Sequence, residues 1–329
     1  MECRREDEEG ALRCPRVDAR VVGAGVVGLS CAIRLQEAGA RVRVRALART
    51  PGTTSDVAAA YYYPSRMAAD PRILRWGRGT LRELARLAED PATGVRAAKA
   101  IHLARPGAER PWWADAMPGF RAARRDELPA GQEAGWVVDT FVAEMPVYLR
   151  ALEARFERAG GAFEAGRVAD VRALARQAQG VVVNATGLGA RECAGDASTY
   201  PIRGQVARVE NPGLLDVVSD PDGPLAVAYV VPRSRDVVLG GTAQEGDWSL
   251  APDPKTEEDI LRKCALLEPR LAGARVTGRA VGLRPGRPAV RLERDADAPN
   301  LVHCYGHGGS GMTLSWGCAD EVAALARQV

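Results

Sequence analysis

The spacing of apolar residues near the start of the chain predicts a strand, a helix and a second strand. Residues 17–22 and 40–45 alternate apolar with polar positions, whereas the apolar residues of 29–38 recur every three or four positions. The hexapeptide GAGVVG fills positions 23–28, between the first strand and the helix. This order predicts a βαβ unit with a glycine turn ahead of its helix.

The same spacing rules predict further elements along the chain. The strand-rich middle, 200–248, does not alternate with helices, so it predicts a second sheet rather than more of the βαβ sheet. We therefore expect an α/β fold in which a doubly wound, Rossmann-like domain is interrupted by a domain with a mixed or antiparallel sheet. Helices are expected at 81–88, 141–159, 257–267 and 319–326, and strands at 180–184, 205–209, 226–231 and 236–239.

The expected boundaries divide the chain into a tail and two domains, both discontinuous in sequence. The charged segment 1–16 is expected to be a solvated tail. The nucleotide-binding domain is expected at 17–60, 140–199 and 285–329, and the substrate-binding domain at 61–139 and 200–284.

Composition narrows the class of protein. The 329 residues are 46% hydrophobic and 26% charged, which is typical of a soluble globular protein of about two domains. The net charge of +3 gives no electrostatic reason to expect a nucleic-acid or membrane partner. Seven widely spaced cysteines without a CxxC pair favour reduced thiols over a metal site. Because no secretory or peroxisomal signal is seen, we expect a cytoplasmic location.

Gly23, Gly25 and Gly28 form the GxGxxG pattern of a dinucleotide-binding turn. Glycines at these positions let the backbone turn tightly, approach a pyrophosphate and pack the helix close to the sheet. The helix N-terminus then directs free N–H groups and a positive dipole end toward the phosphates. The alternative is a glycine turn that serves only packing.

Two features depart from the usual dinucleotide-binding unit. Its second strand normally ends at an Asp or Glu that holds the ribose hydroxyls, but this strand runs into Leu47 with no acid in reach. The first strand also contains Asp18 and Arg20, although a buried central strand favours Val or Ile. The expected ribose contact is therefore missing or comes from elsewhere.

Six further stretches occur in the order found in one family of flavoenzymes. The chain resembles the D-amino-acid oxidase family, and the similarity spans about residues 20 to 320. The matching stretches are TPGTTSDVAAA at 50–60, VNATG at 183–187, RGQ at 203–205, YVVP at 229–232 leading to Gly240 and Gly241, LRPGRP at 283–288 followed by VRLE at 290–293, and YGHGGSGMT at 305–313.

The resemblance implies an FAD-dependent oxidase that deaminates D-amino acids. In this family, a hydride passes from the substrate α-carbon to flavin N5, and oxygen then takes the electrons to form H2O2. The imino acid product is hydrolysed to a 2-oxo acid and ammonia. No side-chain base is needed for this reaction, so His307 is expected to have a structural role in its glycine-rich loop.

The resemblance also implies which residues bind the substrate. Arg284 would form a fork to the α-carboxylate, Tyr229 would add a hydroxyl, and the Gly309 carbonyl would accept from the amine. Without the resemblance, Arg284 would be a surface cation fixed by two prolines, and Tyr229 an amphipathic strand residue. Tyr63 belongs to a run of three tyrosines that either line the substrate pocket or fill the core.

The implied cofactor contacts are distributed over the whole chain. A helix beginning near Trp316 would direct its N-terminus at the flavin C2 carbonyl and N1, and Arg291 would add positive charge there. The Thr53 cluster is otherwise an N-cap. The expected FAD contacts are Gly23, Ala24, Gly25, Val26, Val27, Gly28, Thr53, Thr54, Ser55, Ala59, Ala60, Val168, Gly187, Arg291, Gly308, Gly309, Ser310, Gly311, Met312 and Thr313.

Neutral or apolar D-amino acids are the expected substrates, together with O2. The sequence does not decide whether the protein forms a homo-oligomer. Arg66, if directed into the pocket, would instead favour acidic substrates, and 216–224 could form a short lid. The alternatives are an oxidase of glycine, sarcosine or D-aspartate with the same architecture, or a weakly catalytic flavoprotein-like protein. A nicotinamide dehydrogenase would leave Arg284 and residues 308–313 unexplained.

Overall fold

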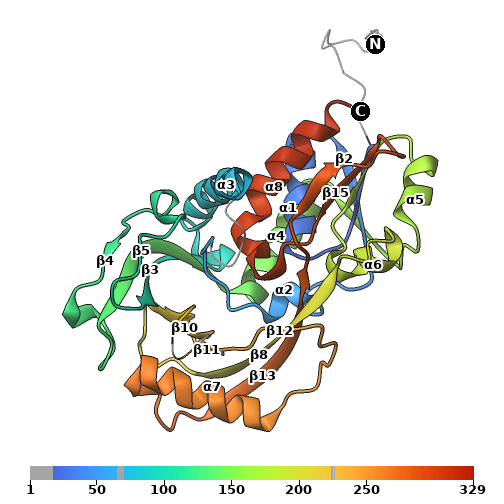
Figure 1. Cartoon of the computed structure of the whole chain (residues 1–329). Coiled ribbons are helices and arrows are strands. Elements are labelled where there is room, and N and C mark those ends of the chain that lie inside the picture. Colours follow the sequence, from blue (N-terminus) through green and yellow to red (C-terminus); the bar gives the residue numbers. More distant parts are fainter. Residues whose placement is uncertain (1–17, 65–69, 224, 226) are drawn as a thin grey trace.

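Two β-sheets with helices packed around them make up the computed structural model, which describes residues 18–64, 70–223, 225 and 227–329 (Figure 1). The expected tail at 1–16 lies outside the described residues, as do Arg66 and Pro224. Among the described helices, none is long and apolar enough to cross a membrane.

The first sheet has six strands in the order β14-β15-β7-β1-β2-β6. Its strand β1 (Asp18–Val22) lies between β2 and β7 and is parallel to both. β14 is the antiparallel edge strand of an otherwise parallel sheet. The other strands are β2 (Arg41–Ala46), β6 (Ala162–Ala165), β7 (Val181–Asn184), β14 (Arg291–Arg294) and β15 (Leu301–Tyr305).

Helices cover both faces of this sheet, because consecutive strand residues point to opposite sides. Val21 belongs to the core shared with Leu29 of α1. Its neighbour Val22 belongs to a separate core with Val171 and Ala175 of α5. The doubly wound arrangement predicted from the sequence is thereby confirmed. The covering helices are α1 (Val26–Glu37), α4 (Met145–Arg158) and α8 (Gly311–Ala326) on one face, and α5 (Val171–Gln177) and α6 (Ala190–Cys193) on the other.

The polar start of β1 is explained by exposure. Asp18 and Arg20 are exposed, while Ala19, Val21 and Val22 are buried. Arg41 on the neighbouring strand donates from Nε to Asp18 Oδ1 at 2.9 Å. The strand is therefore central without having every side chain in the core.

The second sheet is mixed and follows the order β12-β8-β11-β10-β9-β3-β5-β4, with β13 also paired to β8. Strands β3 and β9 are parallel, whereas the other neighbours are antiparallel. Helix α7 (Pro254–Leu267) packs on this sheet through Ile260, Cys264 and Leu267. The strands are β3 (Val95–Ala104), β4 (Arg121–Ala122), β5 (Ala134–Ala143), β8 (Tyr200–Glu210), β9 (Val217–Asp220), β10 (Ala228–Pro232), β11 (Asp236–Gly240), β12 (Gln244–Glu245) and β13 (Val276–Gly286).

Several predicted boundaries are wrong. The helix expected at 141–159 begins only at Met145, because residues 141–143 pair with β3 as the end of β5. The last helix begins at Gly311 rather than near Trp316. The helix expected at 81–88 begins at Pro71, where Asp70 accepts the first free N–H as N-cap (α3, Pro71–Leu87).

Candidate active site

A cavity of about 1010 Å³ opens between the two sheets. Its walls include the chain segments that follow β1, β2, β7 and β15 of the first sheet. Residues of β8, β9, β10 and β13 close it from the second sheet. Ligands of open α/β sheets bind beyond the carboxyl ends of the strands, so the cavity lies where the fold class places a nucleotide.

The glycine turn forms the floor of the nucleotide end. Gly23 has a φ of +113°, and a Cβ there would lie 2.4 Å from the carbonyl oxygen of Ala185. Gly28 does not line the cavity; a Cβ on it would lie 2.0 Å from the Gly23 oxygen, so it allows α1 to approach the strand. Residues 23–27 line the cavity and lead into the N-terminus of α1. A bound pyrophosphate would meet free N–H groups there.

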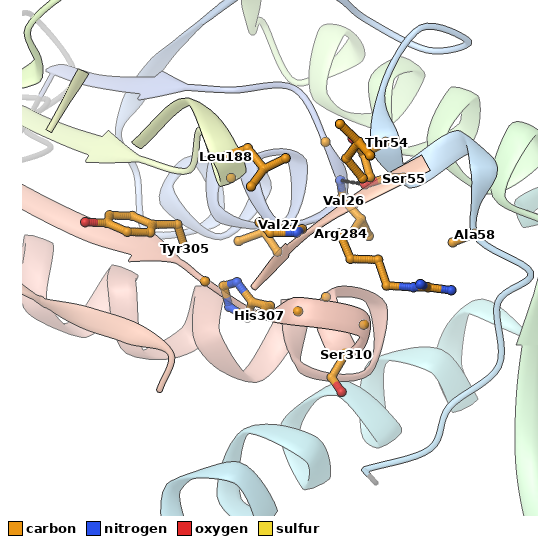
Figure 2. Close-up of a pocket in the computed structure, with 18 of the residues that line it drawn as sticks. Val26, Val27, Thr54, Ser55, Ala58, Leu188, Arg284, Tyr305, His307 and Ser310 are labelled. Atoms are coloured by element: carbon orange, nitrogen blue, oxygen red, sulfur yellow. Dashed lines mark hydrogen bonds between the residues drawn. The ribbon is translucent and has the colours of Figure 1, made fainter. Parts of the chain in front are cut away.

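The short helix α2 (Thr54–Val57) joins the nucleotide turn to the second sheet. Val26 N donates to Ser55 Oγ at 3.1 Å, as the dashed line in Figure 2 shows. Asp56 accepts from both the backbone N and the hydroxyl of Thr53, at 2.8 and 2.7 Å. Thr53, Thr54, Ser55 and the following residues 57–61 line the cavity. Thr53 is therefore both an N-cap and a cavity residue.

Val168 and Gly187, two of the predicted FAD contacts, also line the cavity. Leu47 also lines it, yet 77% of this residue is exposed. Arg45 and Glu192 line the cavity as well, and they were not predicted because neither stands in a recognisable motif.

The loop 306–313 brings a second helix N-terminus to the cavity. All the predicted residues from Gly308 to Thr313 line it, and α8 starts at Gly311. Thr313 Oγ1 accepts from the backbone N of Tyr63 at 3.2 Å, which ties this loop to the tyrosine segment. His307 also lines the cavity, and burial lowers its pKa to about 4, so the imidazole is neutral at pH 7.

Arg291, like Gly28, is a predicted cofactor residue that does not line the cavity. Its guanidinium donates to the Tyr305 hydroxyl at 2.9 Å and to Glu293 at 2.8 Å. Tyr305 in turn donates to Asp196 at 2.8 Å. Since these contacts hold the side chain within a polar network on β14 and β15, a cofactor role for Arg291 stays a prediction.

Arg284 enters the opposite end of the cavity from β13. Figure 2 shows its side chain extended between the segment that carries Ala58 and the turn that carries Ser310. Nη1 donates to the Thr242 carbonyl at 2.8 Å, and no carboxylate of the described residues pairs with the guanidinium. Gly204 makes room for it, because a Cβ there would lie 2.4 Å from both Nη atoms. The unused donors match the two oxygens of a carboxylate.

Tyr229 and Gly309 lie at the same end of the cavity. The Tyr229 ring packs on the backbone of Gly240, where a Cβ would lie 2.0 Å from the ring. Gly309 is next to Arg284, since a Cβ on it would lie 3.5 Å from Arg284 Cδ. The structure thus brings the predicted substrate residues together, although their roles stay predictions.

An aromatic wall at this end combines two of the three tyrosines named from the sequence, Tyr61 and Tyr63, with His102, which was not predicted; Tyr62 is fully buried. Tyr63 stacks on His102 with ring centroids 3.9 Å apart, and the Tyr61 ring centroid lies 5.8 Å from that of Tyr63 and 5.9 Å from that of His102. Ser219 Oγ is 2.8 Å from His102 Nδ1 and accepts from the Tyr61 hydroxyl at 3.3 Å. Burial lowers the pKa of His102 to about 3, so the wall formed by these side chains is uncharged at neutral pH.

Comparison with known proteins places the chain among flavoenzymes. The family model described as FAD dependent oxidoreductase (DAO) matches residues 18–325. A D-amino-acid oxidase of Rubrobacter xylanophilus is 53% identical over 94% of this chain and 97% of that protein. The human D-aspartate oxidase is 39% identical over 93% of both chains.

Solved structures show the same fold. The glycine oxidase of Geobacillus kaustophilus superposes with a TM-score of 0.78 over 95% of both chains, at 21% identity. An L-proline dehydrogenase from P. horikoshii gives a TM-score of 0.79 at 14% identity, covering 95% of this chain and 94% of that one. At these identities, the likeness concerns the fold alone.

Proposed function

The chain belongs to the DAO family of FAD-dependent oxidoreductases, and we propose that it oxidatively deaminates D-amino acids with neutral, mainly apolar side chains. The guanidinium of Arg284, which lines the cavity and has no ion-pair partner among the described residues, carries this proposal. A fixed cation with free, forked donors is suited to the α-carboxylate that all amino acids share. The preference for the D-configuration follows the similar D-amino-acid oxidases.

The residues of the nucleotide end fit FAD. The glycine turn leaves no room for side chains between α1 and the strand, and the cavity continues from there to Arg284. Residues 23–27, 53–55 and 308–313 would hold the cofactor through backbone N–H groups and hydroxyls. When bound, FAD supplies the acceptor for the α-hydrogen as hydride, and O2 takes the electrons to give H2O2.

The protein's own residues then position the substrate. Arg284 and Tyr229 hold the carboxylate, and the Gly309 carbonyl accepts from the neutral amine. The reaction proposed here needs no side-chain base, and a pKa of about 4 makes the His307 imidazole a weak one, so we assign no base. The imino acid product is hydrolysed to a 2-oxo acid and ammonia.

The aromatic wall supports the side-chain preference. Tyr61, Tyr63 and Ser219 present rings and a hydroxyl but no charge to the cavity. Arg72 also lines the cavity, but its guanidinium is paired with Asp70 at 2.8 Å, so it offers no free counter-charge to an acidic side chain. Among the described residues, this wall therefore offers no counter-charge to an acidic side chain, and D-aspartate is expected to be a poor substrate.

Oxygen uptake by the FAD-loaded enzyme tests both parts of the proposal. D-Leucine, D-methionine and D-phenylalanine should be oxidised with a kcat/KM at least about tenfold above that of D-aspartate or glycine, since each methylene group missing from a hydrophobic pocket is worth about 1–3 kcal/mol. The L-enantiomers serve as controls and should be inactive. A preference for D-aspartate would refute the proposed side-chain preference, and equal rates with both enantiomers would refute the proposed reaction.

A further inference from the structure

Three arginines alternate along β2, and the last differs from the other two. Because side chains two residues apart share a face of a strand, Arg41, Arg43 and Arg45 lie on one side. Arg41 donates to Asp18 at 2.9 Å, and Arg43 donates to Glu164 at 3.0 Å. In the described part of the chain, Arg45 has neither an ion pair nor a side-chain hydrogen bond, and its Nε is buried without a partner.

Arg45 stands where the strand meets the cavity. It lines the cavity, and its backbone carbonyl accepts from Gly23 N at 2.9 Å, so it adjoins the glycine turn. Its guanidinium lies against Gly166, where a Cβ would be 3.1 Å from Nη2 and 3.3 Å from Nε. Val168, just beyond Gly166, also lines the cavity. The unpartnered donors thus lie at the end of the cavity that is formed by the glycine turn and the segment after β6.

The charged neighbours do not compensate Arg45. Glu192 and Arg167 line the same end of the cavity, but they are paired with each other and both are well exposed. Leu47, at the position where an acid would hold the ribose, has no polar side-chain atom and is exposed. A buried donor without a partner costs free energy, which a ligand with acceptor atoms at this place would recover.

We propose that Arg45 holds the adenosine half of FAD, in place of the acid that this chain lacks. An acid would accept hydrogen bonds from the ribose hydroxyls, whereas a guanidinium offers only donors. Arg45 therefore donates hydrogen bonds to acceptor atoms of the ribose and adenine. The protein is the donor in this contact, whereas an acid would be the acceptor. This inference rests on the FAD binding included in the proposed function.

Titration of FAD-free protein with flavins tests the assignment without any activity measurement. Quenching of flavin fluorescence gives the dissociation constants of FAD and of FMN, which lacks adenosine. Arg45→Met should weaken FAD binding by about 10- to 100-fold, the range for a hydrogen bond from a charged group, and leave FMN binding unchanged. Arg43→Met, on the same face of β2 but paired with Glu164, should leave both constants unchanged.

Thermal unfolding of the FAD-free proteins separates this role from a structural one. Because no described residue pairs with the Arg45 side chain, Arg45→Met should melt at the wild-type temperature. Arg45→Lys should do the same and recover part of the FAD affinity. Should Arg45→Met fail to fold, Arg45→Lys replaces it in the test. A weaker FAD affinity with an unchanged FMN affinity in Arg45→Lys would then support the assignment, and an unchanged FAD affinity would contradict it.

The outcomes are distinguishable. If the wild-type protein binds FAD and Arg45→Met binds it equally tightly, or if FAD and FMN weaken equally, the assignment of Arg45 is wrong while the proposed function stands. If the wild-type protein binds no FAD, the proposed function and the role of Arg45 are both overturned.

Discussion

At the scale of single residues, the proposed chemistry depends on a cation held in place before any substrate arrives. Thr242 orients one Nη of Arg284, Gly204 gives the guanidinium room, and no described acid neutralises it. A carboxylate that binds there replaces water by a fixed, charge-assisted fork. The binding energy of the substrate should therefore be concentrated in this contact.

Arg284→Met should lower kcat/KM for D-amino acids by roughly 10²- to 10³-fold, mainly through KM, because truncating one partner of a buried charged contact costs about 3–4 kcal/mol. Arg284→Lys should recover only part of this loss, since an ammonium lacks the fork. Arg279→Met, on the exposed part of β13, is the matched control. Steady-state kinetics that show a near-normal KM in Arg284→Met would remove this residue from the site.

The buried His102 makes stability depend on pH. Its pKa is lowered from 6.5 to about 3 by burial. The unfolded chain takes up a proton near pH 6.5 but the folded protein does not, so the free energy of unfolding falls as the pH drops below 6.5. Between pH 7 and pH 5, this one histidine should lower the free energy of unfolding by about 2 kcal/mol.

In urea unfolding of the FAD-free proteins, the free energy of unfolding should therefore fall between pH 7 and pH 5 by about 2 kcal/mol less in His102→Phe than in the wild type. Ser219→Ala, which removes the hydrogen-bond partner but keeps the titrating ring, should retain most of the wild-type pH dependence. An identical loss in His102→Phe and the wild type would mean that His102 is protonated in the folded protein.

Sequence motifs could place Arg284 and Tyr229, because each stands in a short, recognisable stretch. They could not place His102 or Ser219, which lie on β3 and β9 and meet only through the pairing of these strands. Arg45 was visible only as part of a strand without an acid. Its significance depends on which arginines of β2 find partners, and the sequence does not contain that information.

At the scale of elements, α3 and α8 approach each other more closely than ordinary side chains allow. A Cβ on Gly317 would lie 2.0 Å from the backbone oxygen of Trp76. Thr80 accepts from the backbone N of both Trp316 and Gly317 at 3.1 and 3.2 Å. Since α8 begins at the cavity, this contact fixes the helix N-terminus that faces the cofactor site.

Gly317→Ala should destabilise the protein by roughly 1–3 kcal/mol, because the added methyl group overlaps backbone that cannot move away easily. Helix propensity alone predicts the opposite sign, a gain of about 1 kcal/mol for Gly to Ala. The exposed Ala324→Gly on the same helix measures that propensity. Chemical unfolding that finds Gly317→Ala more stable than the wild type would contradict the close packing described above.

The elements that the sequence predicted well are those whose own pattern determines them. The βαβ unit and α7 have clear alternation or helical spacing. Strand β13 was missed because its glycines and arginines resemble a loop, and it becomes a strand through its long pairing with β8. The start of α4 was placed too early because Phe141 and Val142 fit helical spacing, yet they pair with β3.

At the scale of the whole molecule, one cavity joins a nucleotide-binding sheet to a sheet that carries the substrate residues. The glycine turn and α1 define one end, and Arg284 with the aromatic wall defines the other. The residues that form the two ends come from many segments of the chain, which are distributed from Gly23 to Thr313. Such a layout is suited to a long cofactor whose reactive end lies beside a small substrate.

The proposed function depends on hydride transfer from a D-amino acid to FAD bound in this cavity. The most direct test is the visible spectrum of the FAD-loaded protein before and after anaerobic mixing with D-methionine and, separately, L-methionine. We predict that D-methionine bleaches the flavin bands and that L-methionine leaves them unchanged. Bands that persist with D-methionine, D-leucine and D-alanine alike would contradict the proposed reaction.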